Sequence, residues 1–465
     1  MTADSVTPAT DHRDGSAPTD RAAPVDRIAL PGRVADTLGR ARQNVIYRSG
    51  ISGITPAVPT GAENLEAAAR RALLRRPGGR KAWAYIYGGA GSGATMAANR
   101  DAFDRRRLVP RMLRDTAHRD ISTTVLGQHL PAPVLVAPIG AAGLIHRDAD
   151  LLVGRAAAAR GIPYIYSSQG SSPMEETARA MGDAPRWYQL YWSSDEQLVD
   201  SFIARAEAVD AGALVVTLDT TTLGWRPWDL DLGSLPFTRG VGIAQYTSDP
   251  RFAEMVAERV ARDAAAGPGA DPDAVKVTPR AALTLLEMAR NRPGRLLDNL
   301  RAPETRAAVQ TFLDTFSNPA LSWDHLATLR ERTRLPIVLK GVLHPDDARQ
   351  AFDSGVDAVM VSNHGGRQVD GSIGTLDALA RIREAVGPEP TVLLDSGIRT
   401  GTDVVKAMAC GANAVTLGRP HIYGLAIAGE RGVGEVLDNL LAEIDITLSL
   451  CGASSWDDVD GSLLA

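Results

Sequence analysis

The sequence predicts an α/β protein whose eight parallel strands close into a (β/α)8 TIM barrel. Short apolar or β-branched runs recur from residue 131 onward, with helical stretches between most of them. Strands that alternate with helices indicate right-handed βαβ units and a parallel sheet. Eight such units close naturally into a barrel. The expected strands are 134–137, 164–166, 187–191, 213–217, 337–340, 358–361, 392–394 and 414–417.

An open, doubly wound sheet is the alternative for alternating strands and helices. Such sheets usually have fewer strands and a glycine-rich GxGxxG turn after the first one. Here the first expected strand is followed by Pro138-Ile-Gly-Ala-Ala-Gly143, which lacks that pattern. The barrel is therefore favoured. The helices expected between the strands are 148–160, 174–181, 194–211, 345–354, 376–386 and 402–410.

The sequence outside the alternating strands and helices predicts an N-terminal leader before the barrel domain. Residues 1–33 are rich in Thr, Ala, Asp, Pro and Arg without an apolar period, which is typical of a disordered leader. Residues 34–465 are expected to form the barrel domain. It begins with an N-terminal helical segment, weakly patterned over 34–47 and clear over 65–74.

The connection between the fourth and fifth strands, about 115 residues, is too long for a βα loop. We expect an insertion at about 228–325 that folds over the strand ends as a lid. Residues 281–289 and 305–316 have a helical pattern, and 266–273 has the Pro and Gly content of a flexible loop. An oligomer contact without a catalytic part is the alternative for this insertion.

Composition excludes several classes of protein. The net charge of −5 over 465 residues offers no basic field for nucleic acid or an anionic membrane. Cys410 and Cys451 are the only cysteines, and no Cys/His spacing indicates a metal site or a disulfide framework. No apolar run reaches the roughly 20 residues of a membrane span, and no secretory signal is evident. A cytoplasmic location is expected.

The stretch Val361-Ser-Asn-His-Gly-Gly-Arg-Gln-Val-Asp-Gly371 carries the strongest chemical signal. It places His364 and Arg367 just past an expected strand. Histidine can hold a proton near neutral pH, and arginine grips a carboxylate through two hydrogen bonds. This pairing suits proton abstraction next to a carboxylate. A solvated surface loop is the alternative for the stretch taken alone.

Other polar residues lie at or just beyond the ends of the expected strands, where barrel enzymes place their chemistry. Each could be an ordinary rim residue, but together they predict an active site. They are Ser167, Ser168, Gln169, Gln189, Tyr191, Thr217, Asp219, Arg226, Lys340, Ser362, Asp395, Arg399 and Arg419.

The last two strands carry a signal for an anion. Asp395-Ser-Gly-Ile-Arg-Thr-Gly401 leads into a helix, and Gly418-Arg-Pro420 follows the eighth strand. Loops after strands 7 and 8 form the usual barrel phosphate site, where backbone N–H groups and a helix N-terminus hold the anion. A phosphorylated substrate or a phosphate-bearing cofactor is predicted.

Five motifs together resemble the FMN-dependent α-hydroxy-acid oxidases, which include glycolate oxidase and lactate oxidase. They are SNHGGRQ, LDSGIRTGTDVVKAMACGANAVTLGRP, LPIVLKG, WYQLYW and LDTTTLGWR. The resemblance runs from about residue 41 to about residue 450. Within the family, LPFTRGVGIAQYTSDP (235–250) and the long insertion are most similar to the lactate 2-monooxygenase subgroup.

The resemblance implies FMN-dependent oxidation of a small L-2-hydroxy acid to a 2-oxo acid, with O2 reoxidising the cofactor. Similarity to the monooxygenase subgroup adds a possible oxidative decarboxylation, and the family implies a homotetramer. A dehydrogenase that passes electrons to a quinone or a protein is the alternative. A flavin-dependent isomerase would leave Asp219, Arg226, His364 and Arg367 unexplained as a set.

The resemblance also implies residue roles. His364 would be the base, and Asp219 would pair with its imidazole. Tyr191 would hydrogen-bond the substrate, and Lys340 would lie at the flavin N1/O2 edge. The substrate carboxylate would bind Tyr85, Arg226 and Arg367. Cofactor contacts would come from Pro138, Ile139, Gly140, Ser167, Gln189, Thr217, Lys340, Ser362, Asp395, Gly397, Arg399, Gly418 and Arg419.

Three of these positions leave alternatives or depart from the family. Tyr85 could instead pack a helix against the barrel, with Tyr87 leaving the register open by two positions. Asp219 could instead cap a helix. Gln169 stands where the glycolate-oxidase pattern has a tryptophan in the substrate pocket, which puts a short-chain preference in doubt.

Overall fold

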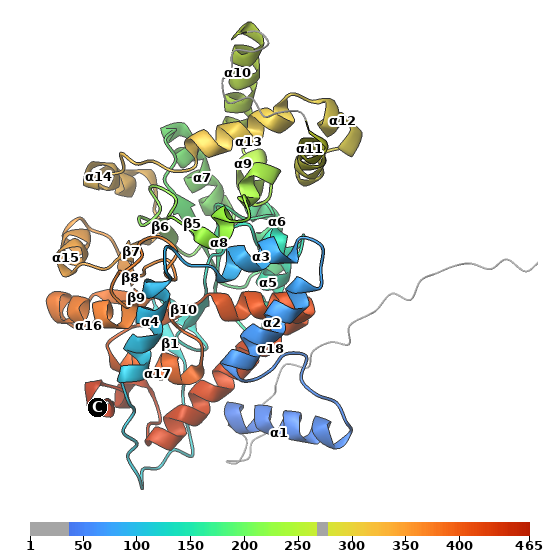
Figure 1. Cartoon of the computed structure of the whole chain (residues 1–465). Helices are drawn as coiled ribbons and strands as arrows, with labels where there is room; N and C mark the ends of the chain where they lie inside the picture. The colour runs from blue at the N-terminus through green and yellow to red at the C-terminus, as the bar shows by residue number, and fades with distance from the viewer. Residues whose placement is uncertain (1–36, 267–277) are drawn as a thin grey trace, which may run out of the picture.

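A closed barrel of eight parallel strands forms the centre of the computed structural model, which describes residues 37–266 and 278–465 (Figure 1). The strands pair in the order β10-β3-β4-β5-β6-β7-β8-β9. This confirms the predicted fold, with strand ends shifted by one or two residues. The strands are β3 (Val134–Val136), β4 (Tyr164–Ser167), β5 (Arg186–Tyr191), β6 (Leu214–Thr217), β7 (Ile337–Val342), β8 (Ala358–Val361), β9 (Thr391–Leu394) and β10 (Ala414–Leu417).

A helix precedes each barrel strand from β4 to β10, as expected of βαβ units. The capping box of Thr400 and Asp403 shows how local sequence starts one of them: each side chain hydrogen-bonds the other's backbone N–H. These helices are α5 (Ala149–Ala158), α6 (Met174–Met181), α7 (Glu196–Ala208), α14 (Trp323–Arg332), α15 (Pro345–Asp353), α16 (Thr375–Val386) and α17 (Gly401–Ala409).

The barrel interior has an apolar lower layer and a polar upper layer. Side chains alternate along a strand, so residues two apart face the same side. The lower layer includes Leu135, Ile165, Trp187, Val215, Val338, Met360, Leu393 and Ala414. Two positions further along seven of these strands come Ser167, Gln189, Thr217, Lys340, Ser362, Asp395 and Thr416, all buried. The polar layer therefore lies at the carboxyl ends of the strands.

A short hairpin closes the opposite end of the barrel. Strands β1 (Thr123–Val125) and β2 (Gln128–Leu130) pair antiparallel, and Val125 and Leu130 join the apolar lower layer. Trp187 donates to the Gln128 side chain at 3.0 Å. Sequence patterns did not predict this hairpin, because three-residue strands show too little alternation.

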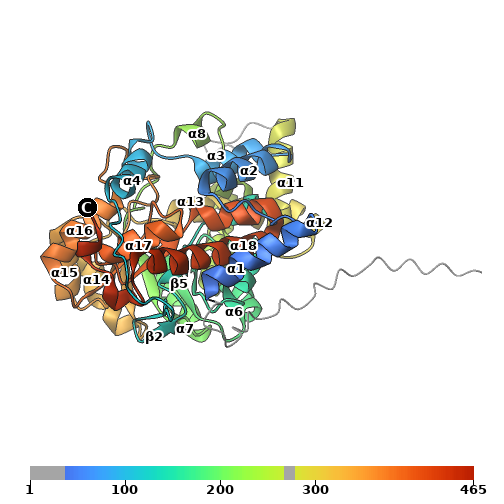
Figure 2. The ribbon, with the colours of Figure 1, turned by 90° about the horizontal axis from the view of Figure 1, so that it is seen from below.

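The first two helices of the described residues pack against the last long helix along one side of the barrel (Figure 2). Helices α1 (Leu38–Ile51) and α2 (Ala62–Leu74) contact the long α18 (Arg419–Cys451). The expected 34–47 helix runs on to Ile51, since the first left-handed residue after it is Gly53. Helix α18 bends at Ala428 and Gly429, where the backbone leaves the helical region. Helices α3 (Gly79–Tyr87), α4 (Ala94–Arg105) and α18 were not predicted as helices.

In the residues that the structure describes, the insertion between β6 and β7 consists of helices joined by loops. It contains α8 (Pro227–Leu230), α9 (Ala244–Thr247), α10 (Pro250–Ala266), α11 (Pro279–Asn291), α12 (Leu296–Arg301) and α13 (Glu304–Thr315). Figure 1 shows α10 to α13 gathered at one end of the molecule. Their core is a buried aromatic cluster of Phe237, Tyr246, Phe252, Phe312 and Phe316, with ring centroids 4.8–6.3 Å apart.

Two sequence predictions lie at least partly outside the described residues. The leader 1–33 falls wholly outside them, and so does most of the expected flexible loop at 266–273. Across the described part of the chain, every helix is too short or too polar to cross a membrane.

Candidate active site

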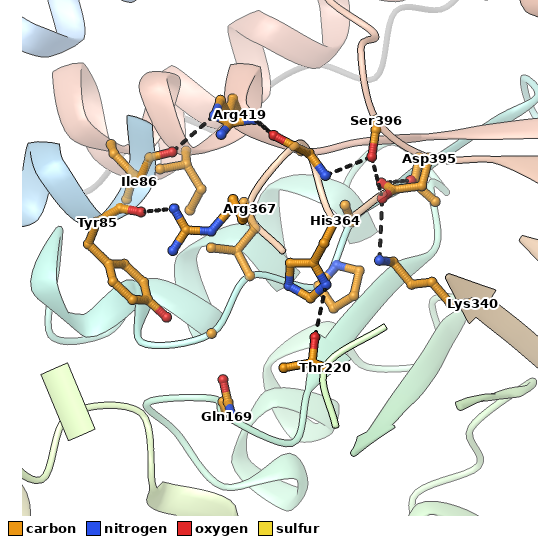
Figure 3. Close-up of a pocket in the computed structure, with 18 of the residues that line it drawn as sticks. Tyr85, Ile86, Gln169, Thr220, Lys340, His364, Arg367, Asp395, Ser396 and Arg419 are labelled. Carbon is orange, nitrogen blue, oxygen red and sulfur yellow. Dashed lines mark hydrogen bonds and ion pairs between the residues drawn. The ribbon is translucent and has the colours of Figure 1, made fainter. Parts of the chain in front are cut away.

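A cavity of about 970 Å3, open to solvent, lies at the polar end of the barrel. Figure 3 shows side chains converging on it from helix α3 and from loops after several strands. Nearly all the predicted catalytic and substrate residues line it: Tyr85, Tyr191, Arg226, Lys340, His364 and Arg367. Asp219 lies just behind His364. The structure therefore brings together residues spread over nearly 300 positions of sequence.

His364 and Asp219 form a hydrogen-bonded pair at the cavity wall. Asp219 Oδ1 lies 2.7 Å from His364 Nδ1. Thr220 Oγ1 donates to the same carboxylate oxygen at 3.0 Å and lies 3.3 Å from Nδ1. On the other side of the ring, Nε2 is 3.4 Å from the Tyr191 hydroxyl. Asp219 thus orients the imidazole and leaves Nε2 facing Tyr191 and the cavity.

The backbone at the pair is unusual in two places. His364 itself has φ +58, and Gly365 and Gly366 continue the left-handed run. At Gly366 a side chain would also clash, since a Cβ would lie 2.8 Å from the backbone nitrogen of Met96. At Gly341, φ is +107 and a Cβ would lie 2.9 Å from that of Asp219. Glycine at both places lets the base and its carboxylate approach.

Electrostatics keep the imidazole neutral and its partner charged. Burial lowers the pKa of His364, and nearby Lys340 adds to this, although Asp219 opposes it. Burial disfavours the charged Asp219 carboxylate, but His364 and Lys340 outweigh that effect and hold its pKa below the ordinary value. A neutral imidazole beside a carboxylate is arranged to accept a proton.

Two arginines face the same cavity beside this pair. Arg226 is 7% exposed and donates to the Arg367 carbonyl at 3.1 Å and to the Gln368 side chain at 2.8 Å. Arg367 donates to the carbonyls of Tyr85 and Gly88, and its guanidinium lies over the Tyr85 ring. Burial and Arg226 lower the pKa of Arg367 to about 9. Two guanidiniums held close together favour an anion between them.

A chain of hydrogen bonds joins the polar layer at the cavity floor. Lys340 donates to Ser362 at 3.0 Å and lies 3.3 Å from Asp395. Ser362 and Thr416 both donate to the Asp395 carboxylate. Burial opposes the lysine charge, but Asp395 and Asp219 raise the pKa of Lys340 above its ordinary value. A fixed positive charge therefore sits inside the barrel mouth.

Two polar atoms of this layer lack partners in the protein. Gln189 Nε2 and Thr217 Oγ1 are buried on adjacent strands, and neither has a hydrogen-bond partner among the described residues. Gln189 Oε1, by contrast, accepts from Ser167 at 2.8 Å. Buried polar groups are rarely left unpaired. Both atoms thus fit a group with its own hydrogen-bonding atoms bound in the mouth.

The far end of the cavity carries a second pair of arginines. Arg399 and Arg419 line it together with Gly397 and Gly418, on the loops after β9 and β10 where barrels hold phosphate. Burial and Arg419 lower the pKa of Arg399 to about 10. Arg419 also donates to the carbonyls of Ile86 and Gly365 (Figure 3). This end has the charge and the glycine backbone for a phosphate.

Sequence reasoning missed several residues of the site, among them three polar ones. Thr220 supports the Asp219 carboxylate. Gln368 links the two halves of the site, since it accepts from Arg226 and donates to the Asp219 carbonyl at 2.7 Å. Ser396 accepts from the Gly365 backbone at 2.8 Å. All three directly follow a predicted site residue, which was the signal available. Pro138, Ile139 and Gly140 line the cavity as expected.

The chain belongs to the FMN-dependent dehydrogenase family, whose family model matches residues 75–465. It is 40% identical over 417 residues to the FMN-dependent alpha-hydroxy acid dehydrogenase qulF of Penicillium citrinum, covering 90% of this chain and 93% of that one. It is 38% identical over 371 residues to an L-lactate oxidase of Lysinibacillus sphaericus, covering 80% and 85%.

The chain is also similar in fold to solved structures of hydroxy-acid oxidases. A mandelate oxidase crystallised with (S)-4-hydroxymandelic acid matches at a TM-score of 0.69 and 32% identity, over 88% of this chain and 98% of that one. The family and the fold predicted from the motifs are confirmed, and so is FMN as the cofactor. The residues present fit FMN, since a phosphate end and an internal lysine line the cavity and two unpaired polar atoms lie buried in the polar layer beside Lys340.

Proposed function

We propose that this enzyme oxidises an L-2-hydroxy acid to the 2-oxo acid, with His364 as the base and O2 as the final acceptor. One observation carries the proposal. The imidazole held by Asp219 faces the same cavity as Arg226 and Arg367, so a proton acceptor and a carboxylate site stand side by side. The relatives' names support the 2-hydroxy-acid class.

Substrate binding begins at the two guanidiniums. The substrate carboxylate binds between Arg226 and Arg367, whose mutual repulsion an anion relieves. Tyr85 adds a hydrogen bond from its phenol, which burial keeps protonated by raising its pKa. Because the carboxylate is fixed, the α-carbon and its hydroxyl are presented to His364 and Tyr191.

His364 and Asp219 together remove a proton from the substrate, either from its hydroxyl or from its α-carbon. The neutral Nε2 of His364 accepts that proton, and the Asp219 carboxylate stabilises the resulting imidazolium through Nδ1. The Tyr191 hydroxyl, 3.4 Å from Nε2, hydrogen-bonds the substrate oxygen and orients it. Burial raises the pKa of Tyr191, so this phenol stays a donor.

The cofactor site uses the rest of the cavity. Pro138, Ile139 and Gly140 would line the ring through their backbone, and Ser167, Gln189, Thr217 and Ser362 would hydrogen-bond the ring or ribityl chain. Lys340 would lie beside the N1/O2 edge, and the ribityl and phosphate end would be held by Asp395, Gly397, Arg399, Gly418 and Arg419. When bound, FMN supplies the acceptor for the two electrons that leave the α-carbon. Lys340 then supplies positive charge where negative charge accumulates.

The insertion, at about 228–325, acts as a lid in this proposal. It contributes Phe237 to the cavity and rests on the barrel, since Ser194 N and Ser193 Oγ both donate to the Thr315 carbonyl. A lid that delays product escape would keep the 2-oxo acid beside newly formed H2O2. Their reaction gives a carboxylic acid shorter by one carbon, CO2 and water, which is oxidative decarboxylation.

Product analysis tests this function. An L-2-hydroxy acid should reduce the bound FMN without oxygen and turn over in air. Acetate from lactate without free H2O2 supports the lid, whereas stoichiometric pyruvate and H2O2 mean that the site opens before decarboxylation. Reduced cofactor that persists for minutes in air would contradict O2 as the acceptor and favour a dehydrogenase.

A further inference from the structure

Gln169 lines the cavity with an unpaired amide. The residue is 5% exposed, and its side chain makes no hydrogen bond to any residue that the structure describes. Figure 3 shows it across the opening from Arg367 and away from Arg419. It therefore lies apart from Arg367 and Arg419, where the remainder of a 2-hydroxy acid would lie.

The loop that carries Gln169 is held rigidly. Its backbone N–H donates to Ser167 Oγ at 3.0 Å, and its carbonyl accepts from Ala141 N at 2.9 Å. The next residue, Gly170, accepts from Ala244 N of the insertion at 3.1 Å. The side chain itself lies over Gly140, since the point where a Cβ of that glycine would stand is 2.9 Å from both Cβ and Oε1 of Gln169. The backbone that carries the amide is thus held on both sides.

Another buried glutamine of this region provides a contrast. Gln245 accepts from Met174 N at 2.8 Å and donates to the Ser172 carbonyl at 3.0 Å. Its amide ties the insertion to the loop after β4. Only a few residues along that loop, Gln169 has neither kind of partner. The Gln169 amide therefore has hydrogen-bonding capacity left toward the cavity, which a ligand's polar group can use.

Apolar and aromatic side chains also line the cavity that Gln169 faces. Tyr85 and Phe237 are 6% and 1% exposed, and their rings meet edge to face with centroids 6.5 Å apart. Leu223 lines the same cavity. These walls suit a carbon chain or ring, and one amide suits one hydrogen-bonding group. The amide carries no charge, so a charged group there would lose its hydration without compensation.

We propose that Gln169 selects 2-hydroxy acids whose side chain carries an uncharged hydrogen-bonding group, such as a hydroxyl. This inference rests on the proposed function and names the substrate class within it. The donor N–H2 and the acceptor oxygen of Gln169 recognise that group, while Leu223 and Phe237 contact the carbons that precede it.

Two pairs of L-2-hydroxy acids of closely similar shape test the inference. 2,4-Dihydroxybutanoate is compared with 2-hydroxypentanoate, and 3-(4-hydroxyphenyl)lactate with 3-phenyllactate. Anaerobic reduction of bound FMN gives kcat/KM for each acid. We expect the hydroxylated member of at least one pair to be preferred roughly tenfold, the value of one satisfied hydrogen bond. Preference for the apolar member of both pairs, or none, would overturn the inference.

A variant assigns the preference to Gln169. Gln169→Met keeps the chain length without the amide and should abolish the preference, chiefly through KM for the hydroxylated acid. Gln197→Leu, at an exposed position of α7, is the control and should retain it. A preference that survives in Gln169→Met would overturn the role. If no 2-hydroxy acid reduces the wild-type enzyme, the proposed function itself fails, which is a distinct result.

Discussion

Each end of the cavity carries a pair of arginines, but the pairs are built differently. Arg226 and Arg367 stand beside His364 and bind carbonyls of α3 and the side chain of Gln368. Arg399 and Arg419 lie on the two glycine-containing loops after β9 and β10. Burial, and after it the neighbouring arginine, lowers the pKa of one member in each pair. Both ends thus favour an anion, yet only one has a base next to it.

The comparison indicates two anions with different fates. In our proposal the anion at the base end is a substrate that must leave, whereas the anion at the loop end is the cofactor phosphate that stays. Substitutions at the base end should therefore slow chemistry and spare FMN binding. Substitutions at the loop end should weaken FMN binding and spare the chemistry of the enzyme that retains it.

The largest effect should come from His364→Gln. Loss of the base should slow anaerobic FMN reduction by about 10²–10⁴-fold, while FMN content stays normal. Stopped-flow absorbance with a 2-hydroxy acid measures the rate. His129→Gln, exposed on the hairpin at the opposite end of the barrel, is the matched control. A near-normal rate of FMN reduction in His364→Gln would show that His364 is not the base.

Arg367→Lys should have the next largest effect. Lysine keeps the charge but loses the planar fork and its hydrogen bonds to α3. We expect kcat/KM to fall roughly tenfold to a hundredfold, the range for lost hydrogen bonds to a charged group. Arg381→Lys, exposed on α16, should leave kcat/KM unchanged. An unaltered kcat/KM in Arg367→Lys would show that this arginine does not bind the substrate carboxylate.

Arg399→Gln tests the loop end. The dissociation constant for FMN, from fluorescence quenching, should rise roughly tenfold, while that for riboflavin, which lacks the phosphate, should not change. The reduction rate per bound FMN should be normal. Equal weakening of FMN and riboflavin would show that Arg399 supports the fold of the site instead of the phosphate. Arg419 is a less clean test, because it also holds Gly365 and α3.

A pH profile gives the smallest expected change. The base works when unprotonated, and burial lowers its pKa, so the reduction rate should fall only below the ordinary pKa of histidine. Asp219 raises the pKa of His364, so Asp219→Asn should move the inflection to lower pH as well as slow the reaction. A shift to higher pH in Asp219→Asn would contradict the pairing.

Much of this architecture could be predicted from the sequence. The eight strands are short apolar runs whose inward positions end in polar residues, such as Val338 followed by Lys340. That periodicity is local, so it is visible without a structure. The phosphate loops were also visible, because their position after the last two strands is typical of barrels.

The parts that escaped prediction depend on contacts distant in sequence. Gln368 contacts Asp219 and Arg226, which are 149 and 142 residues away in the sequence, and no local pattern marks it. The short hairpin closes one end of the barrel because Val125 and Leu130 pack against the apolar residues of the barrel interior. No local pattern shows that contact. Sequence alone also could not show that the Gln169 amide has no hydrogen-bond partner among the described residues, because this depends on the positions of its neighbours in the fold. The roles given to the site residues remain predictions.

The most direct test of the central claim compares one 2-hydroxy acid with its methyl ester. The best acid of the panel and its ester are mixed without oxygen with wild-type enzyme, and the bleaching of FMN is recorded. The acid should reduce FMN rapidly and the ester at least roughly tenfold more slowly, because the ester removes the charge that Arg226 and Arg367 bind. Equal rates for the two, or no bleaching by any acid, would contradict the claim.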